Sequence, residues 1–328
     1  MNYKLKVYYK KEDLPHLDEV SFFHSASTFD LYKNVPNYTP LMVVCFLNNE
    51  PVASLFAHIM RINRFLNTSI FKRCYVSQQP AYYNENLPKE AIFCELLNTL
   101  MKELKHRVFY TEVRNLGDPI FGYKAFRDNC FFSSKWINIK NSLQRKRNIW
   151  NQLSRSRKSQ VNKARRKGVY TEELTNEVEL AEIYELIDKN IHWKFSHRFP
   201  PFSYIENFYH SFILKGKGKI FITKYEGKAI GGIILGLNNN KTAYSLYYWG
   251  KTRTYKNLNP TNYTIWHAMT YAEEHDYEFF DFMDCGYLHE KAGKPRFILQ
   301  FGGKQHATRR WYKFNWSWIN YIAAKFHE

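Results

Sequence analysis

The chain repeats one pattern of elements, and this repeat constrains the fold more than any other feature of the sequence. Residues 42–59, MVVCFLNNEPVASLFAHI, form two apolar runs around a short polar turn, and residues 220–237, IFITKYEGKAIGGIILGL, do the same. Residues 51–55 and 229–233 correspond at an offset of 178. Two apolar runs around a short turn predict a β-hairpin. We therefore expect one hairpin in each half of the chain.

The same order of elements follows each hairpin. It consists of a strand, a loop, an amphipathic helix that opens at a proline, and a second strand. The expected elements are a strand near 69–76, a helix from Pro88 and a strand at 107–111 in the first half, and a strand at 243–249, a helix from Pro260 and a strand at 278–283 in the second. Corresponding elements lie 171 to 178 residues apart. The sequence therefore predicts a duplicated unit of the α/β (α+β) class, each copy a mixed twisted sheet flanked by helices.

Basic residues concentrate between the two halves. Residues 140–168 contain eleven Lys or Arg and no acid, so this segment supplies +11 of the net charge of +18. The chain of 328 residues is long enough for two domains. We expect a first domain at 1–140, a basic linking helix at 141–168 and a second domain at 169–328. The local charge predicts a polyanionic or phosphate-bearing partner.

The basic segment also has an apolar side. In WNQLSRSRKSQVNKARRKGV, the residues Trp150, Leu153, Val161 and Ala164 share one helical face, which should pack against the protein. Arg157 falls on the same stripe. Its guanidinium either snorkels to solvent or points into a substrate groove between the two halves.

Several stretches resemble a known family. They are Phe23-His24-Ser25 followed by Phe29, the basic SRKSQVNKARRKGV, the strand Phe280-Asp281-Phe282, and RFILQFGG at residues 296–303. With the order hairpin, strand, loop, helix, strand in both halves, these stretches resemble the Fem-type peptidyltransferases (FemA/FemB-like proteins) and related tandem GNAT acetyltransferase-like proteins. The resemblance covers most of the chain.

The resemblance implies an acyltransferase that moves an acyl or aminoacyl group to an amine of a cell-envelope or glycan precursor. The acyl donor would be an aminoacyl-tRNA or an acyl-CoA, with no tightly bound cofactor. An acyl-CoA-dependent N-acetyltransferase of a small molecule or sugar nucleotide is the alternative. One position departs from the family pattern, because the lysine that follows the phenylalanine is Ile298 here. Arg296 or Lys304 would have to replace its contribution, unless that contribution is absent.

The loops that could bind phosphate differ from the GNAT pattern. GNAT enzymes hold the coenzyme pyrophosphate on backbone N–H groups of a glycine-rich turn at a helix N-terminus, and neither half has that turn. The second-half loop instead places Lys251, Arg253 and Lys256 before the helix that opens at Pro260. These side chains form either an anion site or a solvated basic loop. By resemblance, Arg198 would contact the diphosphate of a nucleotide-linked acceptor, and a surface cap is the alternative.

Two carboxylates are candidates for the chemistry. Asp281 and Asp284 flank the end of the Phe-rich strand, at an edge where open α/β sheets often present reactive groups. A carboxylate there could deprotonate an acceptor amine if its pKa lies near the working pH. The competing interpretation gives Asp281 a structural role as an acceptor of backbone hydrogen bonds.

Other classes of function compete with this hypothesis. A non-catalytic nucleic-acid-binding protein would also explain the basic segment, although the sequence contains no DNA-reading motif. A degenerate GNAT pair kept as a scaffold is a third reading.

The remaining sequence features bear on location and metal binding. No signal peptide or membrane-spanning run is visible, which predicts a cytoplasmic protein, with the inner face of the membrane as a further location. The five cysteines form no CxxC pair and the His residues no HExxH motif, so we expect no metal site. The segment 309–322 mixes aromatic and basic residues. It either packs as a terminal strand against the second domain, which we favour, or contacts anionic lipid.

Overall fold

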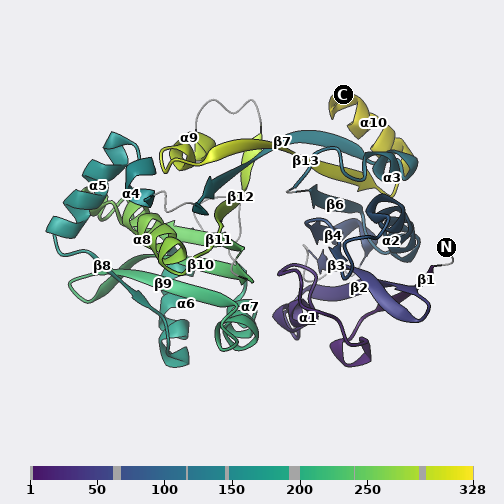
Figure 1. Cartoon of the computed structure of the whole chain (residues 1–328), viewed down its shortest axis with the longest axis horizontal. Helices are drawn as coiled ribbons and strands as arrows, with labels where there is room; N and C mark the ends of the chain where they lie inside the picture. The colour runs from purple at the N-terminus through teal and green to yellow at the C-terminus, as the bar shows by residue number, and fades with distance from the viewer. Residues whose placement is uncertain are drawn as a thin grey trace. The chain divides into compact units, whose positions relative to one another are not determined.

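The protein consists of two compact units in a computed structural model (Figure 1). Unit 1 comprises Met1–Ile137 and Ala307–Glu328, and unit 2 comprises Asn138–His306. The structure describes residues 3–61, 68–115, 117–144, 148–191, 200–239, 241–287 and 293–327. Strands β7 (Phe132–Ser142) and β13 (Lys304–Phe314) each contain residues of both units.

Unit 1 is a mixed sheet with helices on both faces. Its strands lie in the order β1-β2-β3-β4-β6-β13, and β5 pairs with β3. The elements are β1 (Lys4–Tyr8), α1 (Ala26–Tyr32), β2 (Tyr38–Leu47), β3 (Glu50–Arg61), β4 (Lys72–Ser77), β5 (Ala81–Tyr82), α2 (Lys89–Leu104), β6 (Tyr110–Asn115), α3 (Tyr123–Asp128) and α10 (Ser317–His327). Leu96, Leu97 and Leu100 of α2 pack on Leu41 and Leu55 of the sheet in one apolar core. Helix α1 packs on the opposite face, where Phe29 contacts Phe56.

Unit 2 repeats this arrangement. Its strands lie in the order β7-β12-β11-β10-β9-β8. The elements are α4 (Ile149–Gln152), α5 (Arg155–Arg166), β8 (Tyr170–Glu173), α6 (Glu177–Ile191), α7 (Phe202–Phe208) with a π-helical turn (Tyr209–Ile213), β9 (Gly218–Tyr225), β10 (Lys228–Asn238), β11 (Thr242–Gly250), α8 (Pro260–Glu274), β12 (Phe279–Tyr287) and α9 (Lys294–Leu299).

Both predicted hairpins are present, as β2–β3 and β9–β10, and they use the same turn. The two central turn residues have positive φ in each case, 52° and 67° at Asn48 and Asn49, and 49° and 73° at Glu226 and Gly227. This is the type I′ geometry, whose twist matches that of the strands. The strand and helix that we expected after each hairpin are also present, and the α/β fold class is confirmed.

The expectation for the aromatic tail was wrong. Residues 309–314 form part of strand β13 as expected, but they belong to unit 1. These residues pair antiparallel with β6 of unit 1. The physical reason is Trp311, which is 1% exposed and stacks on Phe126 in the core of unit 1, with 4.5 Å between ring centroids.

Candidate functional site

Strands β11 and β12 of unit 2 run parallel but pair over only part of their length. The register joins residues 242–244 to residues 279–281, although each strand has nine residues, all of them described. The equivalent strands of unit 1, β4 and β6, pair over five positions. The strands of unit 2 therefore diverge beyond Tyr244 and Asp281, and we call this divergence the strand fork. The facing edges of diverging strands carry backbone N–H and C=O groups that can bind an extended, amide-containing ligand.

Strand β11 bulges beside the fork. Ile234 pairs with Tyr247 and Leu235 with Ser245, so Leu246 is the extra residue. Bulges of this kind redirect side chains and are common next to active sites. Ser245 follows the last paired residue of β11 directly, is 5% exposed, and its hydroxyl has no hydrogen-bond partner among the described residues. A buried hydroxyl without a hydrogen-bond partner is unusual and indicates a ligand contact. Sequence reasoning missed Ser245.

Asp281 lies at the vertex of the fork and is 4% exposed. Its Oδ1 accepts the Met283 N–H at 2.6 Å, and its Oδ2 accepts the Asn138 side-chain amide at 3.2 Å. Met283 has φ of 55°, unusual for a non-glycine residue, so the carboxylate holds the backbone where β12 turns away. Burial raises the pKa of Asp281, against the lowering effects of the Met283 N–H and of Lys140.

The other predicted residues of this region have different surroundings. Asp284 is half-buried on the diverging part of β12, and its carbonyl accepts a hydrogen bond from Lys294 at 2.9 Å. Arg296 and Lys304 are exposed. Ile298, at the family's lysine position, is 0% exposed and belongs to the core. Arg198 falls within 192–199, outside the described residues.

Arg157 is buried against α9, within unit 2. Its guanidinium lies 4.3 Å from the ring of Phe297 and 5.1 Å from that of Phe301. Nη1 donates to Gln160 at 2.6 Å and Nη2 to the Phe297 carbonyl at 3.4 Å. Burial lowers its pKa. The side chain is 5% exposed, so it does not snorkel.

Two of the four stretches that carried the family resemblance, SRKSQVNKARRKGV and RFILQFGG, therefore contact each other. Besides the Arg157 contacts, the Ser154 N–H donates to the Gln300 carbonyl at 2.9 Å. Gly302 has φ of 92°, and a Cβ there would lie 2.5 Å from the Gln152 carbonyl oxygen, so only glycine fits. We call these contacts between α4–α5 and α9 the motif clamp.

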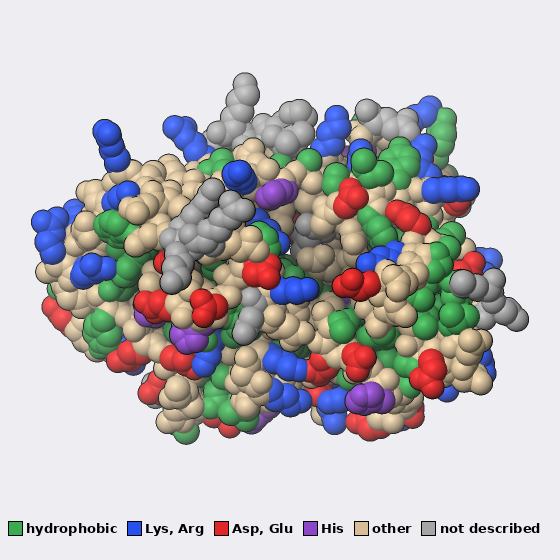
Figure 2. All heavy atoms as spheres, viewed as in Figure 1, with side chains coloured by type: hydrophobic (Ala, Val, Ile, Leu, Met, Phe, Trp, Pro, Cys, Tyr) green, Lys and Arg blue, Asp and Glu red, His purple; other side chains and the backbone are tan. Residues whose placement is uncertain are grey.

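The basic helix α5 and the loop before α8 form one charged surface. Val161 and Ala164 of α5 pack with Leu258 and Tyr263, as the apolar stripe predicted. Lys163 donates to Asn257 of the loop at 3.4 Å. Besides Arg155 and Arg165, the exposed cations of these two segments are Lys163, Arg166, Lys167, Arg253 and Lys256, and we call these five the basic surface. Figure 2 shows Lys and Arg side chains gathered over α5. Lys251, in contrast, is half-buried, and burial lowers its pKa.

The loop before α8 does not form the backbone cradle of acyl-CoA enzymes. The N–H groups of Lys251, Tyr255 and Leu258 donate to backbone carbonyls of the protein. Gly250 packs on the first turn of α8, where a Cβ would lie 2.3 Å from the Thr261 hydroxyl and 2.9 Å from its nitrogen. Gly250 thus covers the first turn of α8, and the exposed side chains of the loop are the candidates for binding phosphate.

Unit 1 carries a polar face that sequence reasoning also missed. The strand registers place His58, Tyr75, Glu112 and Tyr312 in one row across β3, β4, β6 and β13, on the face opposite α2. Arg114 and Arg310 pair with each other two residues to one side of this row, and Arg73 lies two residues to the other side, opposite Tyr110. The signal was present in YTEVRN and TRRWYK, where polar and apolar residues alternate with the period of a strand.

This polar face has more positive than negative charge. Buried Glu112 accepts from Arg114 Nε at 2.8 Å and from Arg310 Nη1 at 3.2 Å. Arg310 also lies 3.8 Å from the ring of Trp136, and Arg73 lies 5.1 Å from that of Tyr110. Burial, followed by the charge of Arg114, lowers the pKa of Arg310. Three guanidiniums against one carboxylate, among aromatic rings, suit an anionic ligand with a planar group.

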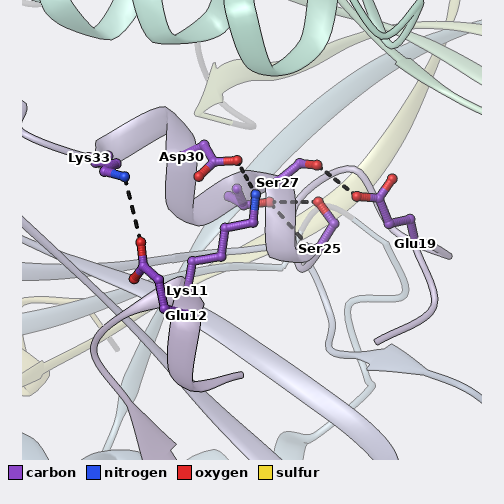
Figure 3. Close-up of polar contacts among 8 residues, drawn as sticks. Lys11, Glu12, Glu19, Ser25, Ser27, Asp30 and Lys33 are labelled. Atoms are coloured by element: carbon purple, nitrogen blue, oxygen red, sulfur yellow. Dashed lines mark hydrogen bonds and ion pairs between the residues drawn. The ribbon is translucent and has the colours of Figure 1, made fainter. Parts of the chain in front are cut away.

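The serine of the opening motif has a local structural role. The Ser25 N–H donates to the Thr28 hydroxyl at 3.3 Å at the start of α1, and the two hydroxyls lie 3.1 Å apart (Figure 3). Ion pairs of Lys11 with Asp30 and of Lys33 with Glu12 tie α1 to the preceding segment. These contacts position α1 under Phe56.

Two absences apply to the described residues. No group of three or more His, Cys, Asp or Glu there could hold a metal ion. No described helix has the length and apolar content needed to cross a bilayer.

The duplicated unit and the strand fork define a tandem GNAT fold, and comparisons with known proteins agree. Residues 154–292 match the family model described as an acetyltransferase (GNAT) domain. A crystal structure of FemX aligns over 99% of both chains with a TM-score of 0.64 and 13% identity. The C-terminal domain of a putative lysylphosphatidylglycerol synthetase from Agrobacterium fabrum aligns over 92% of this chain and 91% of its own, with a TM-score of 0.59 and 12% identity.

A tandem GNAT protein from the clavulanic acid biosynthesis pathway aligns over 88% of this chain and 87% of its own, with a TM-score of 0.55 and 10% identity. No curated protein matches the chain. At these identities the likeness concerns the fold, and the Fem-type resemblance of the sequence is confirmed at that level.

Proposed function

We propose that the protein transfers an acyl or aminoacyl group from a phosphate-bearing carrier to an amine of a cell-envelope or glycan precursor. The observation that carries the proposal is the strand fork of unit 2, with Asp281 buried at its vertex, in the part of the chain that matches the GNAT family. The similarity of fold to FemX and to the lysylphosphatidylglycerol synthetase domain supports the same class of chemistry.

The reaction forms one bond and breaks one bond. The acceptor amine attacks the ester or thioester carbonyl of the acyl donor, the C–N bond forms, and the carrier leaves as an alcohol or thiol. The amine must be neutral, so its proton passes to a base. Asp284, on the diverging part of β12, takes that proton and passes it to the leaving oxygen or sulfur, and Asp281 positions the strand that carries Asp284. Ser245 donates a hydrogen bond near the reacting carbonyl.

The basic surface binds the carrier of the acyl group. Its five cations are exposed side chains, and the backbone N–H groups of Lys251, Tyr255 and Leu258 in the neighbouring loop already bond to carbonyls of the protein. A surface of this kind suits the repeated phosphates of an aminoacyl-tRNA better than one pyrophosphate. Acyl-CoA is the second candidate donor, because residues 154–292 match a family described as acetyltransferases.

The polar face of unit 1 suits a second anionic ligand. Arg114 and Arg310 would contact the anionic group of that ligand, and Trp136 or Tyr75 would stack on a planar group such as a nucleotide base. A nucleotide-linked precursor has both features.

A transfer assay tests this function. The purified protein is offered charged tRNA and acetyl-CoA separately, with thermal unfolding as the readout of binding and mass spectrometry as the readout of transfer. We expect charged tRNA to raise the unfolding temperature and to support transfer. Stabilisation and transfer by acetyl-CoA alone would replace the aminoacyl donor with acyl-CoA. Stabilisation by neither carrier would overturn the transferase proposal.

Matched variants separate the parts of the site. Replacing Lys163, Arg253 and Lys256 by Ala should make the salt dependence of tRNA binding less steep by about one unit of slope per cation. The control replaces three exposed lysines of unit 1, Lys102, Lys124 and Lys135.

Ser245→Ala gives an independent test. Removing a buried hydroxyl that has no partner should leave the unfolding temperature unchanged or raise it. Transfer should nevertheless fall by about tenfold to a hundredfold if the hydroxyl contacts the reacting carbonyl. Transfer at the native rate would remove Ser245 from the site.

A further inference from the structure

Helix α10 of unit 1 presents its large apolar side chains to solvent. Trp318 is 63% exposed, Tyr321 62%, Ile322 47% and Phe326 85%. Their spacing of three and four residues places them on one helical face. Together with Trp316, they are five of the thirteen large hydrophobic residues that are exposed in the described part of the chain. A helix that packs on a globular protein normally turns its large apolar side chains toward the core and not toward solvent.

The exposure does not come from a loosely attached helix. Asn320 anchors α10 through both atoms of its amide: Oδ1 accepts the Phe314 N–H at 2.8 Å, and Nδ2 donates to the Cys130 carbonyl at 2.8 Å. His327 stacks on Phe132, with 5.4 Å between ring centroids. The face that contacts unit 1 consists of half-buried Ile319, Asn320, Ala323 and Ala324.

Positive charge accompanies the apolar face. Residues 304–327 contain five Lys or Arg and no acid. Lys325 lies within this face, with Nζ 4.6 Å from the Tyr321 ring. Asn315 precedes the helix, and its Nδ2 donates to the Leu104 carbonyl at 3.1 Å. This hydrogen bond places exposed Lys105, the residue after Leu104, near the start of α10. Figure 2 shows hydrophobic and basic side chains together over α10.

These features select between possible occupants of the face. Tryptophan and tyrosine prefer the interface between water and lipid headgroups, and cations beside them attract anionic lipids. A second copy of the chain, with its own net charge of +18, would bring like charges together. We infer that α10 docks the protein on an anionic phospholipid surface, with Trp318, Tyr321, Ile322 and Phe326 inserted among the headgroups. This inference does not depend on the proposed transfer reaction.

Vesicle binding of the full chain tests the inference. Flotation with vesicles of mixed phosphatidylglycerol and phosphatidylcholine should recover the protein, and pure phosphatidylcholine should recover much less. Trp318→Ser with Phe326→Ser should lower partitioning by about tenfold or more, because two large exposed apolar side chains are lost. Lys325→Glu should lower partitioning to the anionic vesicles and leave partitioning to pure phosphatidylcholine unchanged. Ile120→Ser, at a residue of unit 1 that is 72% exposed, is the matched control and should bind like the native protein.

The outcomes separate lipid from protein partners. Native binding by the Trp318/Phe326 variant would overturn the inference. So would self-association of the native protein that this variant abolishes, without vesicle binding. The unfolding temperatures of the variant and the native protein should agree, because the replaced side chains face solvent. Transfer to a soluble acceptor should also be unchanged, so failure of the docking inference and failure of the proposed function give different results.

Discussion

Replacing Arg157 by Ala tests whether the motif clamp is structural or contacts a ligand. The guanidinium is buried, with Phe297 and Phe301 beside it and hydrogen bonds to Gln160 and to the Phe297 carbonyl. Gln160 also accepts a hydrogen bond from Asn262 at 2.9 Å, so its oxygen keeps a partner in the variant. The cost of the substitution is therefore the loss of the Arg157 contacts themselves.

The magnitude follows from those contacts. Two cation–π contacts at a buried site contribute about 1 kcal/mol each. The short charged hydrogen bond to Gln160 contributes about 1.5 kcal/mol at the low end of its class. We expect the free energy of unfolding to fall by about 3.5 kcal/mol, which for a unit of this size lowers the unfolding temperature by roughly 10 °C.

Calorimetry and urea unfolding measure this change. Arg157→Lys keeps the charge but loses the planar contacts, so it should fall between Ala and the native protein. Arg155→Ala, at an exposed position of the same helix, is the control and should change little. An Arg157→Ala variant with native stability and abolished transfer would refute the clamp, because the guanidinium would then act on a ligand.

Three further predictions concern pH and backbone geometry. Burial lowers the pKa of His24 to about 4 and that of His58 to about 3, so both are neutral when folded, and the unfolding temperature should fall as the pH drops from about 6.5 toward 4. Burial instead raises the pKa of Asp281, so its protonated form is favoured in the folded state. The stability of the native protein relative to Asp281→Asn should therefore decline as the pH rises above the ordinary pKa of an aspartate, about 4, and a constant difference would contradict this sign. Gly302→Ala should destabilise more than Gly168→Ala in urea unfolding, because both have positive φ, 92° and 82°, but only at Gly302 does a Cβ meet the backbone; equal losses would show that φ alone decides.

The repeated elements were predictable because their signals are local. Each hairpin is encoded by two apolar runs and a turn, and α2 and α8 begin at or directly after Pro88 and Pro260. The apolar stripe of α5 was also readable, since helical periodicity is a property of one segment. These features do not depend on which strands become neighbours.

The candidate site was less predictable, because it depends on which strands become neighbours in the sheet. The strand fork arises from the point at which β12 leaves β11, and no local motif marks it apart from Asp281. The polar face of unit 1 combines residues of β6 and β13, and these two strands lie nearly 200 residues apart in the chain. In the sequence, Ile298 was notable only because the family has a lysine at this position. In the structure, its side chain is buried in the core.

The pairing of β13 with β6 also has a consequence for biosynthesis. Unit 1 is encoded in two pieces, and all of unit 2 lies between them in the chain. A ribosome that has completed residues 1–137 has not yet made Trp311, which fills the core of unit 1 beside Phe126. The nascent first unit must therefore wait with an open sheet edge while the second unit is translated and folds. Strand β13, which is translated after unit 2, thus completes the unit whose translation began first.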